Sequence, residues 1–397
     1  MAPQPPRRSR PELTIHIVTC SPSYLPEVGG AEVGLHEVLR RLTVASNHRI
    51  TVVTATTDLS CPPRAEIDGV EVVRYIRPDR WARWYGPTIA AWRNLPSILE
   101  RLEPDLLHIA YILPSGLAAA SWARRHGVPY VVSVVGSDIA DPFIRPPLPL
   151  RLLADRAIHR SPHVVANSTA VMQIVSSKLS KRATRHVIFL GVDTDRFSPG
   201  IRSAARRVLG LPQYGPIVLA LQRLERRKGI DVLLHAFQDV LKAVPEARLV
   251  IYGRGREGAS LARLSHELGL GDAVLFAGYI DDASKPEAYR AADVFVLASH
   301  YEGLGIVLAE AASTGVPVVA TSEGGTRDFV IDGTTGRLVP PGRPDVLSEV
   351  LVGLLKDQSR CSAMGRAGRE HITSKANIND LVARYKNVFE AAAVTRG

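Results

Sequence analysis

The chain has 397 residues, of which 46% are hydrophobic and 22% are charged, and this composition excludes a largely disordered or low-complexity protein. Its length exceeds what one small core accommodates and predicts two domains. Three widely spaced cysteines, an odd number, argue against a disulfide framework or a zinc site and favour a reducing, cytoplasmic location.

The net charge of +10 is unevenly distributed, because Lys and Arg exceed Asp and Glu by 7 in residues 1–200 and by 3 in residues 201–397. A basic surface can bind nucleic acid, anionic lipid or a phosphate-bearing substrate. Aromatic residues make up only 6% and do not interleave with basic runs, so we expect no nucleic-acid partner. Peripheral attachment to an anionic membrane surface is a hypothesis, and a soluble arginine-rich surface is its alternative. No apolar run is long enough to predict a transmembrane helix.

Residues 1–11 are rich in Pro and Arg and contain no apolar run, so we expect a disordered tail rather than a signal peptide. In residues 12–200, short apolar runs alternate with amphipathic helical stretches and predict a first domain. Continuous apolar strands that are each followed by a helix indicate a parallel sheet covered on both faces. The predicted strands are 13–19, 50–55, 70–74, 106–109, 130–135 and 164–166, and the predicted helices include 31–42, 116–126 and 170–179.

The same alternation restarts in residues 201–375 and predicts a second α/β domain. A polar segment rich in Gly and Pro, from Asp195 to Pro216, separates the two series, and we place the interdomain hinge in it. The predicted fold is therefore two doubly wound, parallel-sheet domains that face each other across a cleft, with ligands beyond the carboxyl ends of the strands. The predicted strands are 217–221, 248–252, 274–276, 294–298 and 318–320, with helices at 231–244 and 257–268.

The most informative segment is 299–314, S-H-Y-E-G-L-G-I-V-L-A-E-A-A-S-T, which directly follows a predicted strand. Gly303 and Gly305 permit a tight turn, and a helix is expected to begin between Leu304 and Ile306. The exposed amides and the positive dipole end of such a helix suit an anion such as a diphosphate.

Glu302 in this turn and Glu310 in the helix can accept hydrogen bonds from sugar hydroxyls. Two arbitrary glutamates would usually be solvated charges, but the glycine-rich strand–loop–helix context favours a site. The pattern E-G-L-G-x-x-x-x-E resembles the signature of retaining glycosyltransferases of family 4, which have two Rossmann-like domains in the GT-B fold. Further segments resemble blocks of this family in the same order, at 29–32, 136–138, 166–168 and 191–197.

Segment 221–229, L-Q-R-L-E-R-R-K-G, resembles a family block, R-L-x-x-x-K-G, whose Arg and Lys hold the diphosphate of the donor. The resemblance assigns this role to Arg223 and Lys228. Two fixed cations beside a helix N-terminus would stabilise charge on the departing nucleotide. We therefore predict a catalytic part for Arg223 and Lys228, together with Glu302. Arg226 and Arg227 are expected to form an exposed turn.

Gly253 begins the sequence G-R-G-R-E-G after a predicted strand, which matches the dinucleotide fingerprint of dehydrogenases. Its place inside the second domain argues against a dehydrogenase, as does the lack of an acidic residue ending a strand about twenty residues later. The resemblance instead makes Gly253 a donor contact and places Gly325 and Thr326 beneath the sugar. For Asp328 we expect helix capping or a first-turn charge. The predicted donor-binding residues are Glu310, Gly303, Leu304, Gly305, Ile306, Gly253, Gly325 and Thr326.

The resemblance also implies that the acceptor binds to the first domain, near Gly29, Gly30 and Asp138. His108 is a further acceptor-side candidate, and a buried, hydrogen-bonded core histidine is the alternative for it. Several positions depart from the polar or glycine residues that are usual in the family, namely Ala110, Val135, Leu190 and Gln222.

The implied activity is retaining transfer of a sugar from a nucleotide-diphosphate sugar to a hydroxyl of a glycan, lipid-linked or small-molecule acceptor. No enzymic nucleophile is evident, so the resemblance implies front-face transfer, in which the leaving phosphate helps to deprotonate the acceptor. We expect no metal and no cofactor, and we interpret residues 193–195, D-T-D, as a structural turn. A sugar-nucleotide epimerase of the same fold and a non-catalytic binder of nucleotide sugars or membrane surfaces are the alternatives. The resemblance further implies that a terminal helix in 376–397 crosses back to the first domain.

Overall fold

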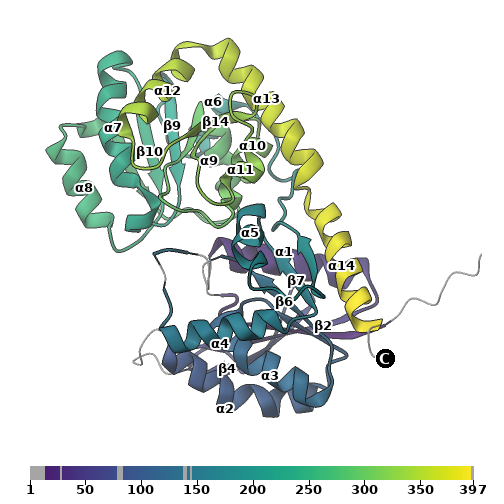
Figure 1. Cartoon of the computed structure of the whole chain (residues 1–397). Helices are drawn as coiled ribbons and strands as arrows, with labels where there is room; N and C mark the ends of the chain where they lie inside the picture. The colour runs from purple at the N-terminus through teal and green to yellow at the C-terminus, as the bar shows by residue number, and fades with distance from the viewer. Residues whose placement is uncertain (1–13, 27–28, 78–83, 137–140, 144, 395–397) are drawn as a thin grey trace, which may run out of the picture.

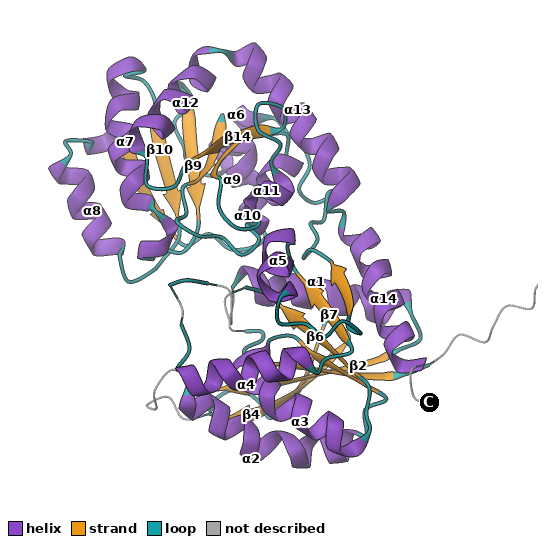
Figure 2. Ribbon diagram, in the orientation of Figure 1, coloured by secondary structure: helices purple, strands orange, loops and turns teal. Residues whose placement is uncertain are grey.

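The computed structural model describes residues 14–26, 29–77, 84–136, 141–143 and 145–394, and these residues form two α/β domains (Figures 1 and 2). Each domain has its own, mainly parallel sheet with helices on both faces. Within the described ranges, no helix is both long and apolar enough to cross a lipid bilayer.

The first sheet has eight strands in the order β3-β4-β2-β1-β5-β6-β7-β8. All neighbouring strands pair in parallel except β3, which is antiparallel to β4. Strands β2, β3 and β4 lie on one side of β1, and β5 to β8 follow in order on the other, so the strand order reverses between β1 and β5. The strands are β1 (His16–Ser21), β2 (Arg49–Thr56), β3 (Arg64–Ile67), β4 (Val70–Ile76), β5 (Leu106–Ile109), β6 (Tyr130–Val134), β7 (His163–Ala166) and β8 (Thr184–Val187).

Successive side chains of β1 point to opposite faces of this sheet, as a strand requires. Ile17 belongs to the core beneath α1, whereas Val18 and Cys20 belong to the core beneath α2, α3 and α4. Apolar residues on both faces explain why these strands are continuous apolar runs in the sequence. The elements between the strands are α1 (Gly30–Ala45), α2 (Tyr85–Leu102), the short irregular turn η1 (Ile112–Gly116), α3 (Leu117–His126), α4 (Leu148–His159) and α5 (Thr169–Ser176).

The second sheet has six parallel strands in the order β11-β10-β9-β12-β13-β14, which reverses between β9 and β12. The strands are β9 (Ile217–Leu221), β10 (Arg248–Tyr252), β11 (Val274–Gly278), β12 (Val294–Leu297), β13 (Val318–Thr321) and β14 (Gly336–Val339). The remaining elements are η2 (Arg226–Lys228), α7 (Ile230–Ala243), α8 (Gly258–Glu267), η3 (Gly271–Ala273), α9 (Lys285–Ala291), α10 (Ile306–Ser313), α11 (Thr326–Phe329), α12 (Pro344–Lys356) and α13 (Gln358–Lys375).

The segment that we expected to be an irregular hinge contains a helix, α6 (Arg202–Val208). This helix packs against α9 of the second domain. Its Arg206 is buried, and the guanidinium donates hydrogen bonds to Asp293 Oδ2 at 2.7 Å and to the carbonyl of Ala291 at 3.0 Å. The buried ion pair anchors α6 to the second domain, so irregular chain in this segment is confined to the flanks of α6.

The last helix, α14 (Ile378–Val394), packs against α1, β5 and β6 of the first domain. Figure 1 shows α13 and α14 following one another along one side of the molecule, from the second domain to the first. Tyr385 and Phe389 of α14 contact the ring of His108, with ring centroids 6.4 and 5.0 Å away. The two domains are therefore joined by a buried apolar contact as well as by the linker.

Candidate active site

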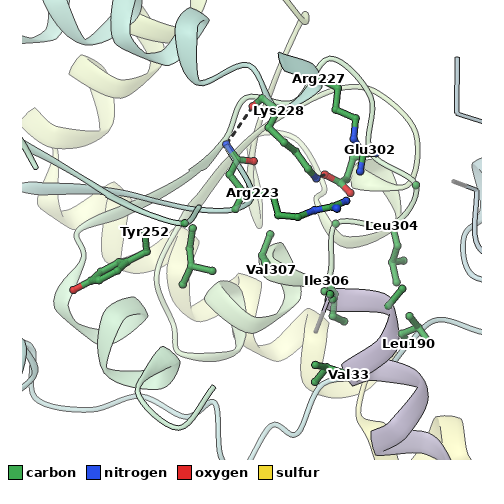
Figure 3. A pocket seen from close by; sticks show the side chains of 18 of the residues that line it. Val33, Leu190, Arg223, Arg227, Lys228, Tyr252, Glu302, Leu304, Ile306 and Val307 are labelled. Atoms are coloured by element: carbon green, nitrogen blue, oxygen red, sulfur yellow. Dashed lines mark hydrogen bonds and ion pairs between the residues drawn. The ribbon is translucent and has the colours of Figure 1, made fainter. Parts of the chain in front are cut away.

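A cavity of about 450 Å³ lies between the two domains, beyond the carboxyl ends of their strands. The first domain contributes the start of α1 and residues that follow β6, β7 and β8. The second domain contributes the loops that follow β9, β10, β11 and β12. Figure 3 shows labelled side chains from both domains around it, such as Val33 and Leu190 from the first and Ile306 and Val307 from the second. The cavity occupies the place where doubly wound sheets bind ligands.

Helix α10 begins at this cavity. Gly305 precedes the helix with φ of +78°, a conformation that glycine adopts without strain, and no side chain caps the helix start. The amides of a first helical turn have no intrahelical acceptor and attract anions. The predicted donor residues Gly303, Leu304, Gly305 and Ile306 all line the cavity.

The loop after β9 supplies the predicted cations to the same cavity. The Arg223 side chain is 59% exposed and lies 3.1 Å from Glu225. Lys228 is buried, and its Nζ lies 2.6 Å from Oε2 of Glu302 (Figure 3). Glu302 also accepts a hydrogen bond from Ser299 Oγ at 3.2 Å. The structure thus brings the residues predicted to be catalytic together and adds that Lys228 and Glu302 form an ion pair.

Two glycines let the β9 loop approach its neighbours. Gly229 has φ of +62°, and a Cβ there would lie 2.1 Å from the carbonyl oxygen of Ala298. Gly253 has φ of +148°, and a Cβ there would lie 1.9 Å from the carbonyl oxygen of Gln222. Gly253, predicted to contact the donor, lines the cavity, and its close contact shows that it also holds the loop of Arg223 in place.

Glu310 lies in α10 but is not among the residues that line the cavity. Its carboxylate is buried, accepts a hydrogen bond from the Tyr289 hydroxyl at 2.6 Å, and lies 3.6 Å from Lys285 Nζ. Lys285 lines the cavity and also pairs with Asp282 at 3.0 Å. Burial lowers the pKa of Lys285, but the carboxylates of Glu310 and Asp282 outweigh it and leave this pKa raised. Sequence reasoning missed Lys285 and Tyr289, for which the loop after β11 offered no motif.

Our expectation that Arg227 is exposed was wrong. Its side chain is only 12% exposed, because it lies across the cleft against Asp141 of the first domain, whose side chain is fully buried. The guanidinium donates to Asp141 Oδ2 at 2.8 Å and to Glu225 Oε2 at 3.0 Å. Arg227 therefore lines the cavity and links the two domains, whereas Arg226 is exposed as expected.

Gly325 and Thr326 do not line the cavity, but Gly325 packs against the loop that does. A Cβ on Gly325 would lie 2.5 Å from the carbonyl oxygen of Gly303, and Thr326 Oγ1 donates to the carbonyl of Thr321 at 2.7 Å. Asp328 is a charge in the first turn of α11, one of the two roles expected for it. Its carboxylate accepts hydrogen bonds from the amide and the hydroxyl of Thr169, at 2.8 and 2.6 Å, and so caps α5 of the other domain.

Of the residues predicted to lie near the acceptor, Gly29 and Gly30 line the cavity, whereas Asp138 lies outside the described residues. The structure does not place His108 at the cavity. Its ring is buried between Thr19 Oγ1 at 3.2 Å and Ser133 Oγ at 2.9 Å, and burial lowers its pKa to about 3. His108 is therefore a neutral core residue, as the alternative for it proposed, and its assignment to the acceptor side was wrong.

The residues that depart from the family pattern lie at the cavity or in the core. Val135 and Leu190 line the cavity, which makes its first-domain wall more apolar, while Ala110 is buried in the core. Gln222 lines the cavity and donates from Nε2 to the carbonyl of Lys228 at 3.2 Å. Among the described residues, no group of three or more His, Cys, Asp or Glu side chains could hold a metal ion.

Sequence comparison decides the family. A model described as "Glycosyltransferase Family 4" matches residues 28–196, and one described as "Glycosyl transferases group 1" matches residues 201–371. A D-inositol 3-phosphate glycosyltransferase from Frankia alni is 30% identical to this chain over an alignment of 407 positions. The alignment covers 93% of this chain and 97% of that protein. The chain belongs to glycosyltransferase family 4.

This family 4 protein is also similar to the GDP-mannose-dependent monoacylated alpha-(1-6)-phosphatidylinositol monomannoside mannosyltransferase of Corynebacterium glutamicum. The two are 36% identical over 211 residues, 51% of this chain and 55% of that protein, so the match spans about half of that relative. Among solved structures, a sucrose-phosphate synthase from Thermosynechococcus elongatus superimposes with a TM-score of 0.84 at 24% identity, covering 95% of this chain and 98% of that one. The predicted GT-B fold is confirmed.

Proposed function

We propose that this protein is a retaining glycosyltransferase that moves a sugar from a nucleotide-diphosphate sugar to an acceptor hydroxyl. One observation carries the proposal. Arg223, Lys228 and the uncapped start of α10 converge on one interdomain cavity, with Lys228 only 2.6 Å from Glu302, just before that helix. Cations and helix amides in one place suit a diphosphate.

In the proposed complex, Arg223 and Lys228 bind the diphosphate together with the amides of residues 303–306. Glu302 accepts hydrogen bonds from the sugar. Glu310 does not line the cavity, so it acts at the ribose end through Lys285, which lines the cavity 3.6 Å from it. The two cations offset the charge that forms on the departing nucleotide, so we propose a reaction that needs no metal.

Bond making and bond breaking are proposed to occur on one face of the sugar. The bond between the anomeric carbon and the phosphate oxygen breaks, and the acceptor oxygen bonds to that carbon from the same side. The acceptor hydroxyl proton passes to the leaving phosphate, so no enzymic base is required. Closure of the two domains excludes water that would otherwise hydrolyse the donor.

A panel of nucleotides and nucleotide sugars tests the donor. The relative from Corynebacterium glutamicum is named as a GDP-mannose-dependent mannosyltransferase of a phosphatidylinositol mannoside. The relative from Frankia alni is named as a D-inositol 3-phosphate glycosyltransferase. We therefore expect a UDP or GDP sugar to raise the unfolding temperature in thermal-shift assays, since a ligand at 100 times its Kd adds about 2.7 kcal/mol. No shift with any UDP or GDP sugar would contradict the proposal.

The acceptor class is tested with the donor so found. Transfer to an inositol phosphate, a phosphatidylinositol or a glycan, detected by mass spectrometry, is the expected result. Isomerised donor in the absence of any acceptor would indicate an epimerase. Binding without consumption of the donor in the presence of all three acceptor classes would indicate a non-catalytic binder.

We further propose that the protein works at the cytoplasmic face of an anionic membrane, through α4. Three leucines of this helix, Leu148, Leu152 and Leu153, are 51–59% exposed. Arg151, Arg156 and Arg160 on or next to the same helix are exposed as well. An exposed face of apolar and basic side chains is typical of helices that lie in the membrane interface. Each basic residue near such a surface contributes about 1 kcal/mol of attraction.

Vesicle co-sedimentation tests this attachment. The protein should sediment with vesicles containing anionic lipid at low salt, and much less with purely zwitterionic vesicles. The double substitution of glutamate for Leu152 and Leu153 should abolish sedimentation. Val208→Glu, at a 73% exposed site on α6 of the other domain, is the matched control and should change nothing. Equal sedimentation of wild type and the α4 variant would rule out this face.

A further inference from the structure

Gln222 carries a buried oxygen with no hydrogen-bond partner. It follows β9, lines the cavity, and stands where the family usually has glycine. The residue is 8% exposed. Its Nε2 donates to the carbonyl of Lys228 at 3.2 Å, and this hydrogen bond sets the orientation of the side-chain amide. The other end of the amide, Oε1, is buried and unpaired. Buried polar atoms are almost always hydrogen-bonded, so this oxygen requires an explanation.

A second oxygen of the same kind belongs to a residue that lines the cavity from the first domain. Asn167, which follows β7, is 5% exposed and donates from Nδ2 to the carbonyl of Val135 at 3.0 Å. Its Oδ1 is buried and has no partner. Each of the two walls of the cavity therefore includes a residue with an unsatisfied acceptor. Hydroxyl groups are the ligand groups that such acceptors suit.

The chemistry of these oxygens limits which ligand groups can form hydrogen bonds with them. An amide carbonyl only accepts hydrogen bonds, and ionised phosphate oxygens also only accept them, so phosphate cannot satisfy Gln222 Oε1. A hydroxyl group can. The amide of Gln222 donates a hydrogen bond to the backbone of Lys228, and the side chain of Lys228 pairs with Glu302. Because we assign Glu302 to the sugar rather than to the nucleoside, we assign Gln222 to the sugar end as well.

We infer that Gln222 is a sugar-recognition residue, whose Oε1 accepts a hydrogen bond from a hydroxyl of the donor sugar. The inference rests on the proposed function. It adds a specificity contact that family members with glycine at this position lack. A site built to pair with a hydroxyl discriminates against sugars that lack it, because the buried acceptor is then left unpaired.

The test compares the binding of nucleotide and nucleotide sugar to one variant. Gln222→Met keeps the length of the side chain and removes its hydrogen bonds. We expect it to weaken binding of the nucleotide sugar about three- to tenfold, as loss of one neutral hydrogen bond does, and to leave binding of UDP or GDP within about twofold. Isothermal titration of the folded variant gives both values. Gln238→Met is the matched control, because Gln238 also donates to a backbone carbonyl, that of Leu268, but lies away from the cavity.

The outcomes separate the two proposals. Equal weakening of nucleotide and nucleotide sugar would show that Gln222 acts only by positioning Lys228, and would overturn the inference. Unchanged binding of both would show that water satisfies the oxygen, and would overturn it as well. If Gln222→Met does not fold, Gln222→Gly, the residue usual in the family, replaces it with the same expectation. Failure of the wild-type protein to bind any nucleotide or nucleotide sugar would instead contradict the proposed function itself.

Discussion

Replacing Arg223 with alanine should lower kcat/KM for sugar transfer by at least about 100-fold, because one charged contact to the developing phosphate charge is lost. Arg223 is 59% exposed and its ion pair with Glu225 lies at the surface, so the unfolding temperature should stay near that of wild type. Initial rates with the donor and acceptor that the assays under Proposed function identify measure the effect.

Arg226→Ala is the matched control for this experiment. Arg226 lies in the same loop but is exposed and does not line the cavity, so its loss should leave turnover unchanged. If Arg223→Ala retained activity within about tenfold of wild type, the assignment of the diphosphate to this loop would be wrong.

Lys228→Met should cost stability as well as activity. Lys228 and Glu302 are paired at 2.6 Å with side chains only 11% and 14% exposed, so removing the amine leaves a largely buried carboxylate without its cation. Removing one partner of a buried pair destabilises a protein by about 3–5 kcal/mol. The loss of a phosphate contact should also reduce turnover by at least about 100-fold. Denaturant unfolding and initial rates measure the two effects.

A double variant separates the two consequences. Adding Glu302→Gln to Lys228→Met removes the uncompensated charge, so most of the lost stability should return while activity stays low. An unfolding free energy of Lys228→Met equal to that of wild type would contradict the ion pair, and recovered activity in the double variant would contradict the role of Lys228 in transfer.

The sequence predicted the buried strands well because parallel strands covered on both faces are continuous apolar runs. Strands β9 and β10 were predicted with the bounds that the structure shows. Three short edge strands were missed, β3, β8 and β14. Strands β3 and β8 have no fully buried residue, so their sequences lack that apolar signal. Helix α6 was missed because its flanking glycines and prolines suggested a linker, whereas its stability comes from the distant Asp293.

The candidate site could be predicted where a local pattern carries the function. The glycines of the turn before α10 and the two predicted cations of the β9 loop, Arg223 and Lys228, lie at the cavity. Contacts between distant segments could not be predicted in this way. Arg227 was judged exposed because nothing near it in sequence reveals Asp141, and Lys285 was missed because its partner Glu310 lies on another helix. His108 was offered as a site residue, but its partners Thr19 and Ser133 come from neighbouring strands.

A crystal structure with UDP or GDP bound tests the central claim most directly. We expect the diphosphate in the interdomain cavity, within hydrogen-bond distance of the Arg223 guanidinium and the Lys228 amine, and against the backbone amides that open α10. A nucleotide bound elsewhere, with this cavity empty or closed, would contradict the account.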